Sequence, residues 1–313
     1  PLGAAALEVD EAWLGTVGEA LRPDALLLLN LSRDQLDRVA EVRRLADRWR
    51  EVAIANPQAH VVANADDPLV VWAGAAAKMV SWVAAGQPWR EDAVGCPSCG
   101  GRIAFDDDGS WACQACGFAR PEPDVVIAGS DLVAEGVAFP ISLALPGRAN
   151  RANAAMAATA ARVAGVGFAD SLRAMETTTD VDGRYRRTRL EGVDVRLLLA
   201  KNPAGWLEVF DMLAPSPGPV VVVINARIAD GRDPSWLWDV PFERLAGRTV
   251  AASGERSRDL AVRLSYAGVD FRRIDDPLEA VKALGVSGAV AVDVAANYTA
   301  MRDVNHRLGG NGA

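Results

Sequence analysis

Apolar runs and polar turns alternate along the chain in the way that buried strands alternate with helices. Residues 25–31 form an apolar run that predicts a strand, and Ser32 or Asp34 can cap a helix that continues to about residue 55. The apolar positions of this helix recur at helical spacing: Leu36, Val39, Val42, Leu45, Ala46 and Trp49. Residues 60–63 predict a second strand, which ends in a polar turn at 64–68. This alternation favours a parallel sheet, whose ligands gather where the strands end.

A small insertion and a second domain follow. Residues 91–120 are rich in Gly, Pro and Cys, which predicts an inserted module. Helices are expected at 149–164 and 169–175, before a polar, turn-prone stretch at 176–183. Beyond it, strands are expected at 196–200, 220–225, 249–252, 271–274 and 289–293, with helices such as 206–213 and 277–283 between them. We therefore expect one α/β domain at 1–178, which contains the insertion, and another at 179–313.

The composition excludes several classes of protein. With 313 residues, of which 50% are hydrophobic and 24% charged, the chain can bury a large core and is not intrinsically disordered. The formal net charge of -8 argues against a nucleic-acid partner, although a few placed Arg or Lys residues can still bind a small anion. No apolar run approaches the roughly 20 residues of a membrane-spanning helix, and no signal-peptide pattern is present, so we expect a cytoplasmic protein. The chain begins with Pro1, and we expect a fragment or a processed product.

The four cysteines form the clearest motif. Cys96 and Cys99 make one Cys-x-x-Cys pair, Cys113 and Cys116 make another, and thirteen residues separate the two pairs. Two such knuckles present four thiolates that converge on a zinc ion, in a closed and therefore structural site. Two disulfides or free thiols are the alternatives. Because the cysteines are used here and the chain holds only 2 histidines, it cannot build a Cys-His glutaminase site of its own.

Two polar motifs in the first domain could bind a nucleotide and its metal ion. Glu8 lies in an acidic segment that looks like a strand end, where it could hold Mg²⁺; an acidic turn in solvent is the alternative. Asn150 and Asn153 lie three residues apart at a predicted helix start, where free backbone N–H groups favour anions. This geometry suits an adenine edge or a phosphate, and the alternative is a helix cap with a solvent-facing Asn.

Basic and acidic motifs follow in the second domain. Lys201 comes directly after an apolar strand, where a Lys can neutralise a phosphoryl group. Arg184 belongs to the basic segment 183–187, for which a solvated basic face is the alternative. The loop after residues 220–225 concentrates Asp230, Asp233 and tryptophans. Long loops of this content at strand ends are commonly functional. In the alternative, the tryptophans pack in the core and the acids cap the next helix.

In this order, the motifs resemble those of the Mur ligase superfamily, and specifically its MurT branch, the ligase-like subunits of lipid II isoglutaminyl synthases. The matching segments are LEVDEA at 7–12, NLSRDQLDR at 30–38, NADDP at 64–68, the four-cysteine insertion, GRANRANAA at 147–155, GRYRR at 183–187, KNPAG at 201–205 and DGRDPSWLWD at 230–239. The resemblance implies a Mur-ligase-type central ATPase domain with an inserted four-cysteine zinc ribbon, followed by a Rossmann-like α/β C-terminal domain. It also implies ATP-dependent amidation of the D-glutamate α-carboxylate of the lipid II stem peptide to D-isoglutamine, through an acyl phosphate, at the inner face of the membrane.

The resemblance also assigns roles to residues. The ATP site would comprise Glu8 at Mg²⁺, Asn150 and Asn153 at the base, and Arg184 with Lys201 at the phosphates. Ammonia would come from a GatD-type glutaminase subunit in a heterodimer, whose Cys and His act as nucleophile and base. Asp230 or Asp233 is expected to orient that His.

Two departures from the family pattern stand out. The chain has no G-x-x-x-x-G-K-[ST] phosphate loop, which the family carries upstream of LEVDEA, so we expect this chain to lack that segment and to be inactive alone. Gln35 and, by ungapped counting, Arg50 stand where amino-acid-adding Mur ligases have a His and a carbamylated Lys. The substitution at Gln35 is expected for the MurT branch and indicates a changed magnesium environment. A Mur or folylpolyglutamate-type ligase that joins a free amino acid is the alternative enzyme. A non-catalytic zinc-ribbon scaffold is the alternative outside the enzymes.

Overall fold

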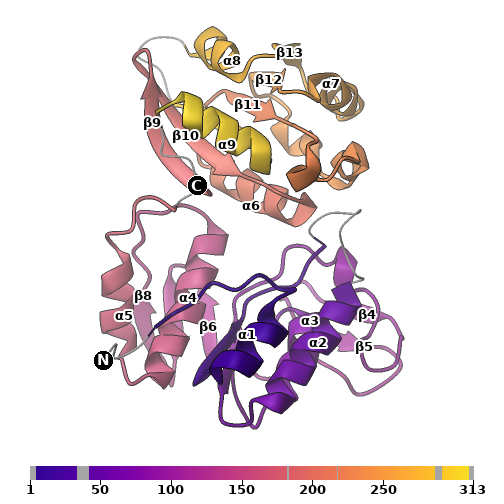
Figure 1. Ribbon diagram of the computed structural model, residues 1–313, viewed down its shortest axis with the longest axis vertical. Helices are drawn as coiled ribbons and strands as arrows, with labels where there is room; N and C mark the ends of the chain where they lie inside the picture. Colours follow the sequence, from indigo (N-terminus) through magenta and orange to yellow (C-terminus); the bar gives the residue numbers. More distant parts are fainter. Residues whose placement is uncertain (1–4, 34–41, 182, 217, 286–290, 310–313) are drawn as a thin grey trace. The chain divides into compact units, whose positions relative to one another are not determined.

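The computed structural model describes residues 5–33, 42–181, 183–216, 218–285 and 291–309. The chain forms two compact units, which Figure 1 colours by sequence. The described part of the first unit comprises residues 5–32, 42–142 and 151–176; the second comprises residue 33, residues 143–150 and the described residues from 177 onward. Each unit is built around a six-stranded sheet.

The sheet of the first unit runs in the order β1-β2-β3-β6-β7-β8. Its strands are β1 (Ala25–Leu28), β2 (His60–Asn64), β3 (Met79–Ala84), β6 (Val125–Ala128), β7 (Asp131–Ala134) and β8 (Val137–Pro140). The strands from β1 to β6 pair in parallel, and β7 and β8 add an antiparallel meander. β2 is buried from Val61 to its end, which is why its sequence is apolar without alternation. β1 ends before the predicted residue 31, because Leu28 already pairs with Ala63 beside the turn that ends β2.

The helices described in this unit follow the predicted periodicity. They are α1 (Leu14–Leu21), α2 (Val42–Ala55), α3 (Pro68–Gly74), α4 (Arg148–Val163), whose first three residues belong to the second unit, and α5 (Phe168–Met175). Leu45, Ala46 and Trp49 are buried on α2, which confirms the predicted helical face, whereas Leu36 and Val39 lie outside the described residues. The helices predicted at 149–164 and 169–175 are confirmed as α4 and α5. In the part of the chain that the structure describes, no helix combines the length and the apolar character that crossing a bilayer requires.

The acidic segment around Glu8 is not a strand. Residues 5–10 have no regular secondary structure, and none of the described strands pairs with them. The Leu7 side chain is 64% exposed, so the alternation of apolar and acidic residues buries no face here. An alternating segment is held as a strand only where a sheet edge pairs with it and a core covers one face. The predicted strand end at Glu8 is therefore wrong.

Residues 91–120 form the predicted insertion, which we call the four-cysteine ribbon. It contains the short helix η1 (Glu91–Ala93) and an antiparallel pair of strands, β4 (Ile103–Phe105) and β5 (Trp111–Cys113). Its core joins Ile103, Trp111 and Cys113 to Val71 of α3. The ribbon is thus a folded module whose small core is continuous with that of the first unit.

The sheet of the second unit runs in the order β13-β12-β11-β14-β10-β9. Its strands are β9 (Tyr185–Leu190), β10 (Val193–Leu199), β11 (Val220–Val223), β12 (Val250–Ser253), β13 (Phe271–Arg273) and β14 (Val292–Ala296). All pair in parallel except β9, which is an antiparallel edge strand.

The helices of the second unit cover both faces of its sheet. They are α6 (Pro203–Leu213), α7 (Ser257–Tyr266), α8 (Pro277–Leu284) and α9 (Tyr298–Arg307), with the short η2 (Ile228–Asp230), η3 (Pro234–Asp239) and η4 (Phe242–Leu245). α6 and α7 contribute to the core on one face, and α8 and α9 to the core on the other. This two-sided layering on a mainly parallel sheet is the expected Rossmann-like architecture.

One predicted strand of this unit is displaced along the chain. The strand expected at 289–293 is β14 (Val292–Ala296), and residues 289 and 290 lie outside the described residues. Asp293 lies inside β14, fully buried, and both of its carboxylate oxygens bond to Arg196 of β10, with an Nη2–Oδ2 distance of 2.8 Å. In the sequence, an acidic residue after an apolar run looks like the end of a strand. Here the strand continues past Asp293, because Arg196 compensates its charge inside the sheet. β9 and α9 were not predicted from the sequence, whereas α7 lies between two predicted strands, where a helical segment is expected.

Candidate functional site

Four thiols of the four-cysteine ribbon meet at one point. The Sγ atoms of Cys96, Cys99, Cys113 and Cys116 all lie within 4.8 Å of one another. The Cys96–Cys116 and Cys99–Cys113 pairs are 3.8 and 3.6 Å apart, so the alternative of two disulfides is wrong. Four sulfurs at about 2.3 Å from a tetrahedral zinc would be separated by ~3.8 Å. The cluster could therefore hold a metal ion.

Backbone N–H groups donate hydrogen bonds to two of these sulfurs. The N–H of Gly101 donates to Cys99 Sγ at 3.4 Å, and the N–H of Ala115 donates to Cys113 Sγ at 3.3 Å. The bond from Ala115 lowers the pKa of Cys113 to about 7, which favours its thiolate, whereas burial raises the pKa of Cys96 and the neighbouring thiols Cys116 and Cys113 raise that of Cys99. A Cβ at Gly101 would lie 3.2 and 3.3 Å from the Sγ atoms of Cys113 and Cys99, which leaves little room for any side chain. The donor set and this cradle fit a four-thiolate site.

The NADDP loop at 64–68 joins the last residue of β2 to the first residue of α3, and it holds the buried carboxylate of Asp67. One oxygen of Asp67 accepts hydrogen bonds from the N–H groups at the start of α3. The other accepts from the N–H of Leu31 at 2.8 Å and from the Gln87 side chain at 2.7 Å. Burial raises the pKa of Asp67 to about 6, against the opposing effect of these hydrogen bonds. Asp67 thereby ties the segment after β1 to the start of α3.

The start of α4 differs from the expected anion site. The N–H of Arg148 donates to Asp211 of α6 at 2.7 Å, and the Arg148 side chain bonds to Glu208 of the same helix. Carboxylates of the protein itself therefore face the positive end of α4, and the expectation of free N–H groups there is wrong at Arg148. Gly147, just before the helix, has a φ of 95°, and a Cβ on it would lie 2.6 Å from Met212. The GRANR motif needs this glycine for its close packing on α6.

The residues expected to hold the nucleotide and its magnesium have these environments. Asn150 donates to the carbonyl of Pro146 at 2.6 Å, whereas Asn153 is exposed on α4. This is the arrangement of the alternative, in which one Asn supports the helix start and the other faces solvent. Glu8 is exposed in the irregular segment 5–10. The nucleotide role of the two asparagines and the magnesium role of Glu8 stay predictions.

Arg184 and Lys201 come to the same edge of the second sheet. The N–H of Leu199, the last residue of β10, donates to the carbonyl of Arg184 at 2.9 Å, so the start of β9 lies beside the end of β10. Both side chains are exposed, and the Lys201 Nζ lies 5.2 Å from the centroid of the Tyr298 ring. Asn202 caps α6 by accepting from the N–H of Gly205 at 2.8 Å. The arrangement offers two cations at the carboxyl end of a parallel strand.

Asp230 is a buried structural carboxylate. It is 4% exposed and accepts from the N–H of Thr299 at 2.8 Å, from the Thr299 hydroxyl, and from the N–H of Arg227 at 3.2 Å. These bonds join η2 to the first turn of α9. The expectation that Asp230 is placed to orient a histidine of another protein disagrees with this burial, because its oxygens already accept from its own chain.

Asp233 has the opposite environment. It is exposed, and it caps η3 through one oxygen, Oδ1, which accepts from the N–H of Ser235 at 2.9 Å. Five residues further on, Trp238 is 54% exposed and its ring meets that of Tyr266, which is 78% exposed, at 5.3 Å between centroids. Trp236 of the same loop is buried in the core. The alternative for this loop, with tryptophans in the core and acids as caps, thus holds for Trp236 but not for Trp238.

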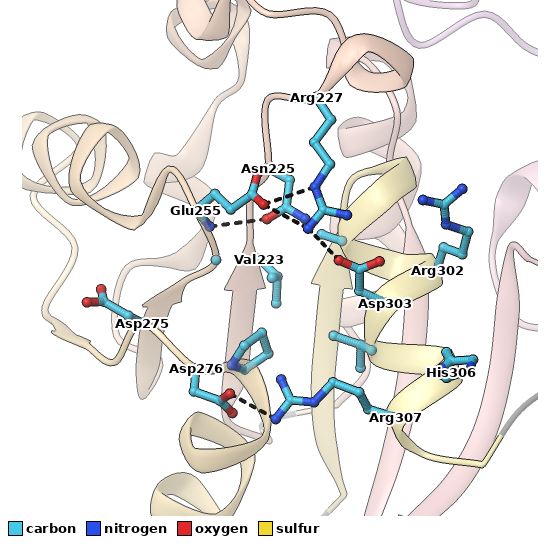
Figure 2. A pocket seen from close by; sticks show the side chains of 14 residues that line it. Val223, Asn225, Arg227, Glu255, Asp275, Asp276, Arg302, Asp303, His306 and Arg307 are labelled. Atoms are coloured by element: carbon cyan, nitrogen blue, oxygen red, sulfur yellow. Dashed lines mark hydrogen bonds and ion pairs between the residues drawn. The ribbon is translucent and has the colours of Figure 1, made fainter.

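A groove of about 700 Å³ opens at the ends of β11 and β12 (Figure 2). Val223 is among its lining residues, and Figure 2 shows ion pairs between other residues of the lining. Arg227 bonds to Glu255 and to Asp303 at 2.7 Å each, and Arg307 bonds to Asp276 at 2.8 Å. The lining residues include none of the residues assigned a catalytic or nucleotide role from the sequence. The groove is therefore a separate cavity of the second unit, with both charged and apolar side chains in its lining.

Two asparagines at strand ends were not singled out from the sequence. The N–H of Asn225 donates to the side chain of Asn297 at 3.0 Å, and the Asn297 amide donates to the carbonyl of Asn225 at 2.7 Å. This reciprocal pair joins the ends of β11 and β14. The signal that could have found them is a single Asn directly after a run of apolar residues, Ile224 before Asn225 and Ala296 before Asn297.

Arg50, which replaces the carbamylated Lys of amino-acid-adding ligases by position, has a structural role. Its Nη1 donates to the carbonyl of Trp72 at 2.6 Å, and its guanidinium lies 4.2 Å from the centroid of the Trp72 ring. Gln35 lies outside the described residues. Arg50 is thus held against α3.

Comparison with known proteins shows what this chain is similar to. Residues 199–301 match a family model described as MurT ligase C-terminal. The chain is 27% identical, over 97% of its length, to the lipid II isoglutaminyl synthase (glutamine-hydrolyzing) subunit MurT of Streptococcus pneumoniae, and it covers 74% of that protein. It is 30% identical, over 85% of its length, to the subunit of the same name from Staphylococcus aureus strain COL, of which it covers 65%.

Solved structures show the same fold at lower identity. A pseudomurein peptide ligase type C from Methanothermus fervidus superposes with a TM-score of 0.70 at 16% identity, covering 94% of this chain and 65% of that one. MurF from Acinetobacter baumannii gives a TM-score of 0.65 at 15% identity, covering 94% of this chain and 61% of that one. The chain thus has a Mur-ligase-like fold and spans less than two thirds of these two structures and of the staphylococcal relative.

Proposed function

Because residues 199–301 form a MurT-type C-terminal domain within a chain of Mur-ligase-like fold, we propose that this chain is the ligase subunit of a glutamine-dependent lipid II amidotransferase. One observation carries the proposal: the four cysteines of this chain all meet in a single cluster. Glutamine hydrolysis, which the relatives' names include, needs a nucleophile such as a thiol. A partner protein would supply it.

The proposed reaction converts the D-glutamate α-carboxylate of the lipid II stem peptide into an amide. A carboxylate does not react with ammonia at neutral pH, because its oxygen is a poor leaving group. Transfer of the γ-phosphoryl group of ATP to the carboxylate gives an acyl phosphate and ADP; ammonia then displaces phosphate and forms the amide. Arg184 and Lys201, at one edge of the second sheet, are the cations that we assign to neutralising the transferred group.

The ATP site is proposed in the first domain, which we take as residues 1–178, and residues 179–313 form the second. Asn150 and Asn153 would contact the base, and Glu8 would hold Mg²⁺, which supplies positive charge to the phosphates. The four-cysteine cluster would hold zinc, whose role is structural because four thiolates leave no open coordination position.

The partner would be a glutaminase subunit of the GatD type, in a heterodimer. Of the two acids in the DGRDPSWLWD loop, Asp233 is the better candidate to orient the partner's histidine. It is exposed, and the oxygen with which it caps η3 is Oδ1, so Oδ2 is the oxygen that we assign to the histidine. The exposed aromatic pair of Trp238 and Tyr266 supports docking beside it, since exposed aromatic side chains are typical of protein interfaces. The complex would work in the cytoplasm at the inner face of the membrane, where lipid II is its substrate.

Two other functions compete with this one. A ligase that adds a free amino acid would require the His and carbamylated Lys of that branch, and Arg50 is instead held against Trp72. A zinc-ribbon scaffold would bind the partner and catalyse no reaction itself.

The test incubates the full-length protein, co-expressed with its glutaminase subunit, with lipid II, ATP and glutamine, and follows the mass of lipid II. The proposal is supported if lipid II is converted from the acid to the amide only when both subunits are present. Addition of a whole amino acid would identify the other ligase, and no change in a complex shown to form would favour the scaffold.

A further inference from the structure

The four-cysteine ribbon is bonded directly to the loop at 64–68, at the edge of the first sheet where β2 ends. The indole N–H of Trp111, a residue only 2% exposed, donates to the carbonyl of Ala65 at 3.0 Å. The Nε of Arg120 bonds to Asp66 Oδ1 at 2.7 Å, and Asp66 is 7% exposed. One contact comes from the strand that carries Cys113, and the other from the residue that ends the ribbon.

The same loop joins three strand ends of the first sheet. The second oxygen of Asp66 accepts from the N–H of Gly86, which follows β3. Asp67 accepts from the N–H of Leu31, which follows β1. A loop that follows β2 is therefore fixed by its two acids to the segments after both neighbouring strands of the sheet.

We infer that Trp111 and Arg120 are positioning residues through which metal binding at the four-cysteine cluster fixes the loop at 64–68 and, with it, the backbone of Gly86 and Leu31. The inference concerns the geometry of the loop and stands without the proposed amidation. Its consequence for catalysis rests on the proposed function: ligands of parallel sheets bind where strands end, so the ribbon would order the substrate-binding edge of the first sheet.

The physical reason is that the ribbon's own core is too small to persist without metal. Ile103 and Trp111 pack with Val71 and the cysteines themselves, and Phe118 meets the rings of Trp111 and Trp72. Small modules held by four thiolates fold only when metal is bound. Loss of the metal would unfold the ribbon and separate Arg120 from Asp66. The nearly buried carboxylate of Asp66 would then have no cation beside it, which is unfavourable. We expect the loop to change conformation so that water reaches this carboxylate.

The first experiment measures amide hydrogen exchange and zinc content of the full chain in wild type and in Arg120→Ala. The variant keeps all four cysteines, so we expect one zinc per chain and unchanged protection in β4 and β5. Protection at the Gly86 and Asp66 amides should fall by about tenfold, as expected when one ion pair to a nearly buried carboxylate is lost. Arg102→Ala is the matched control, because Arg102 is exposed on the same ribbon, and it should leave both amides unchanged.

Conservative variants separate positioning from a general loss of stability. Arg120→Lys keeps a cation for Asp66 and should restore most of the protection at Gly86. Trp111→Phe keeps an aromatic ring in the ribbon core but removes the bond to Ala65, and it should weaken protection in the loop at 64–68 while zinc stays bound.

Removal of zinc from the wild-type chain with a chelator tests the coupling between the four-cysteine cluster and the loop at 64–68 without any mutation. We expect the amides of β4 and β5 to lose protection together with those of Gly86 and Leu31, while the Val62 amide in the centre of β2 stays protected. Loop amides that keep wild-type protection in Arg120→Ala, or after chelation has unfolded the ribbon, would overturn the inference.

Discussion

Asp230 and Thr299 are joined by two hydrogen bonds, from the backbone N–H and from the hydroxyl of the threonine, although 69 residues separate them in sequence. The pair holds the start of the DGRDPSWLWD loop to the first turn of α9. The same loop then exposes Asp233 and Trp238. Asp230 thus fixes the start of the loop from a buried position, whereas Asp233 of the same loop is exposed.

Replacing Asp230 should reduce stability. Asp230→Ala removes the acceptor for three donors, including the Thr299 hydroxyl, and we expect a loss of about 1–3 kcal/mol in the free energy of unfolding. Urea denaturation of the full chain measures it. Thr299→Val removes only the hydroxyl, and the double variant should lose less than the sum of the single losses, because the two residues share a bond. Additive losses would show that the two side chains are not coupled.

Replacing Asp233 should separate the two nitrogen sources. Asn caps a helix about as well as Asp, so Asp233→Asn should keep η3 folded. We expect glutamine-dependent amidation to fall by at least about a hundredfold, in the range seen when the acid of such a site is replaced, while activity with added ammonia is spared. Asp239→Asn, an exposed acid at the end of η3, is the control and should affect neither. Equal loss with both nitrogen sources would contradict the role of Asp233.

The four-cysteine cluster should bind one zinc per chain. Cys113→Ser removes one of the four thiolates and should weaken zinc binding by more than about tenfold, measured by competition with a chromogenic chelator. Ser98→Ala changes an exposed, non-ligand residue between Cys96 and Cys99 and should bind zinc like the wild type. A fully folded ribbon that contains no metal after purification would contradict the assignment.

Asp67 predicts a specific pH dependence of stability. Its pKa rises from 3.8 in the unfolded chain to about 6 in the folded protein, because it is buried. The folded state therefore binds the proton more tightly, and the stability that this provides is present below pH 4 and is lost as pH rises to about 6. Relative to Asp67→Asn, the wild type should lose about 3 kcal/mol of unfolding free energy over this interval, an order-of-magnitude figure. Urea titrations of both proteins from pH 4 to pH 7 measure it, and parallel curves would contradict the raised pKa.

The sequence predicts what depends on local spacing. The two Cys-x-x-Cys pairs predict the cluster because each knuckle is a local turn, and the buried face of α2 follows from the spacing of Leu45, Ala46 and Trp49. The order of strands and helices likewise indicates two α/β units.

Pairings between distant residues could not be predicted. Asp293 looks like a strand end until Arg196, 97 residues away, is seen to bond to it inside the sheet. Arg120 and Asp66 lie 54 residues apart, and no local pattern links the end of the ribbon to the loop after β2. The environments of Asp230 and Asp233 differ for the same reason: only the tertiary fold brings Thr299 to one of them.

The most direct test of the account follows heavy nitrogen from the side-chain amide of glutamine into lipid II. The full-length protein and its glutaminase subunit are incubated with ATP, labelled glutamine and lipid II, and the product is analysed by mass spectrometry with fragmentation of the stem peptide. The account predicts label in the α-amide of the D-glutamate residue, dependent on ATP and on both subunits. A complex that forms and hydrolyses glutamine but leaves lipid II as the free acid, or that incorporates an entire amino acid, would contradict it.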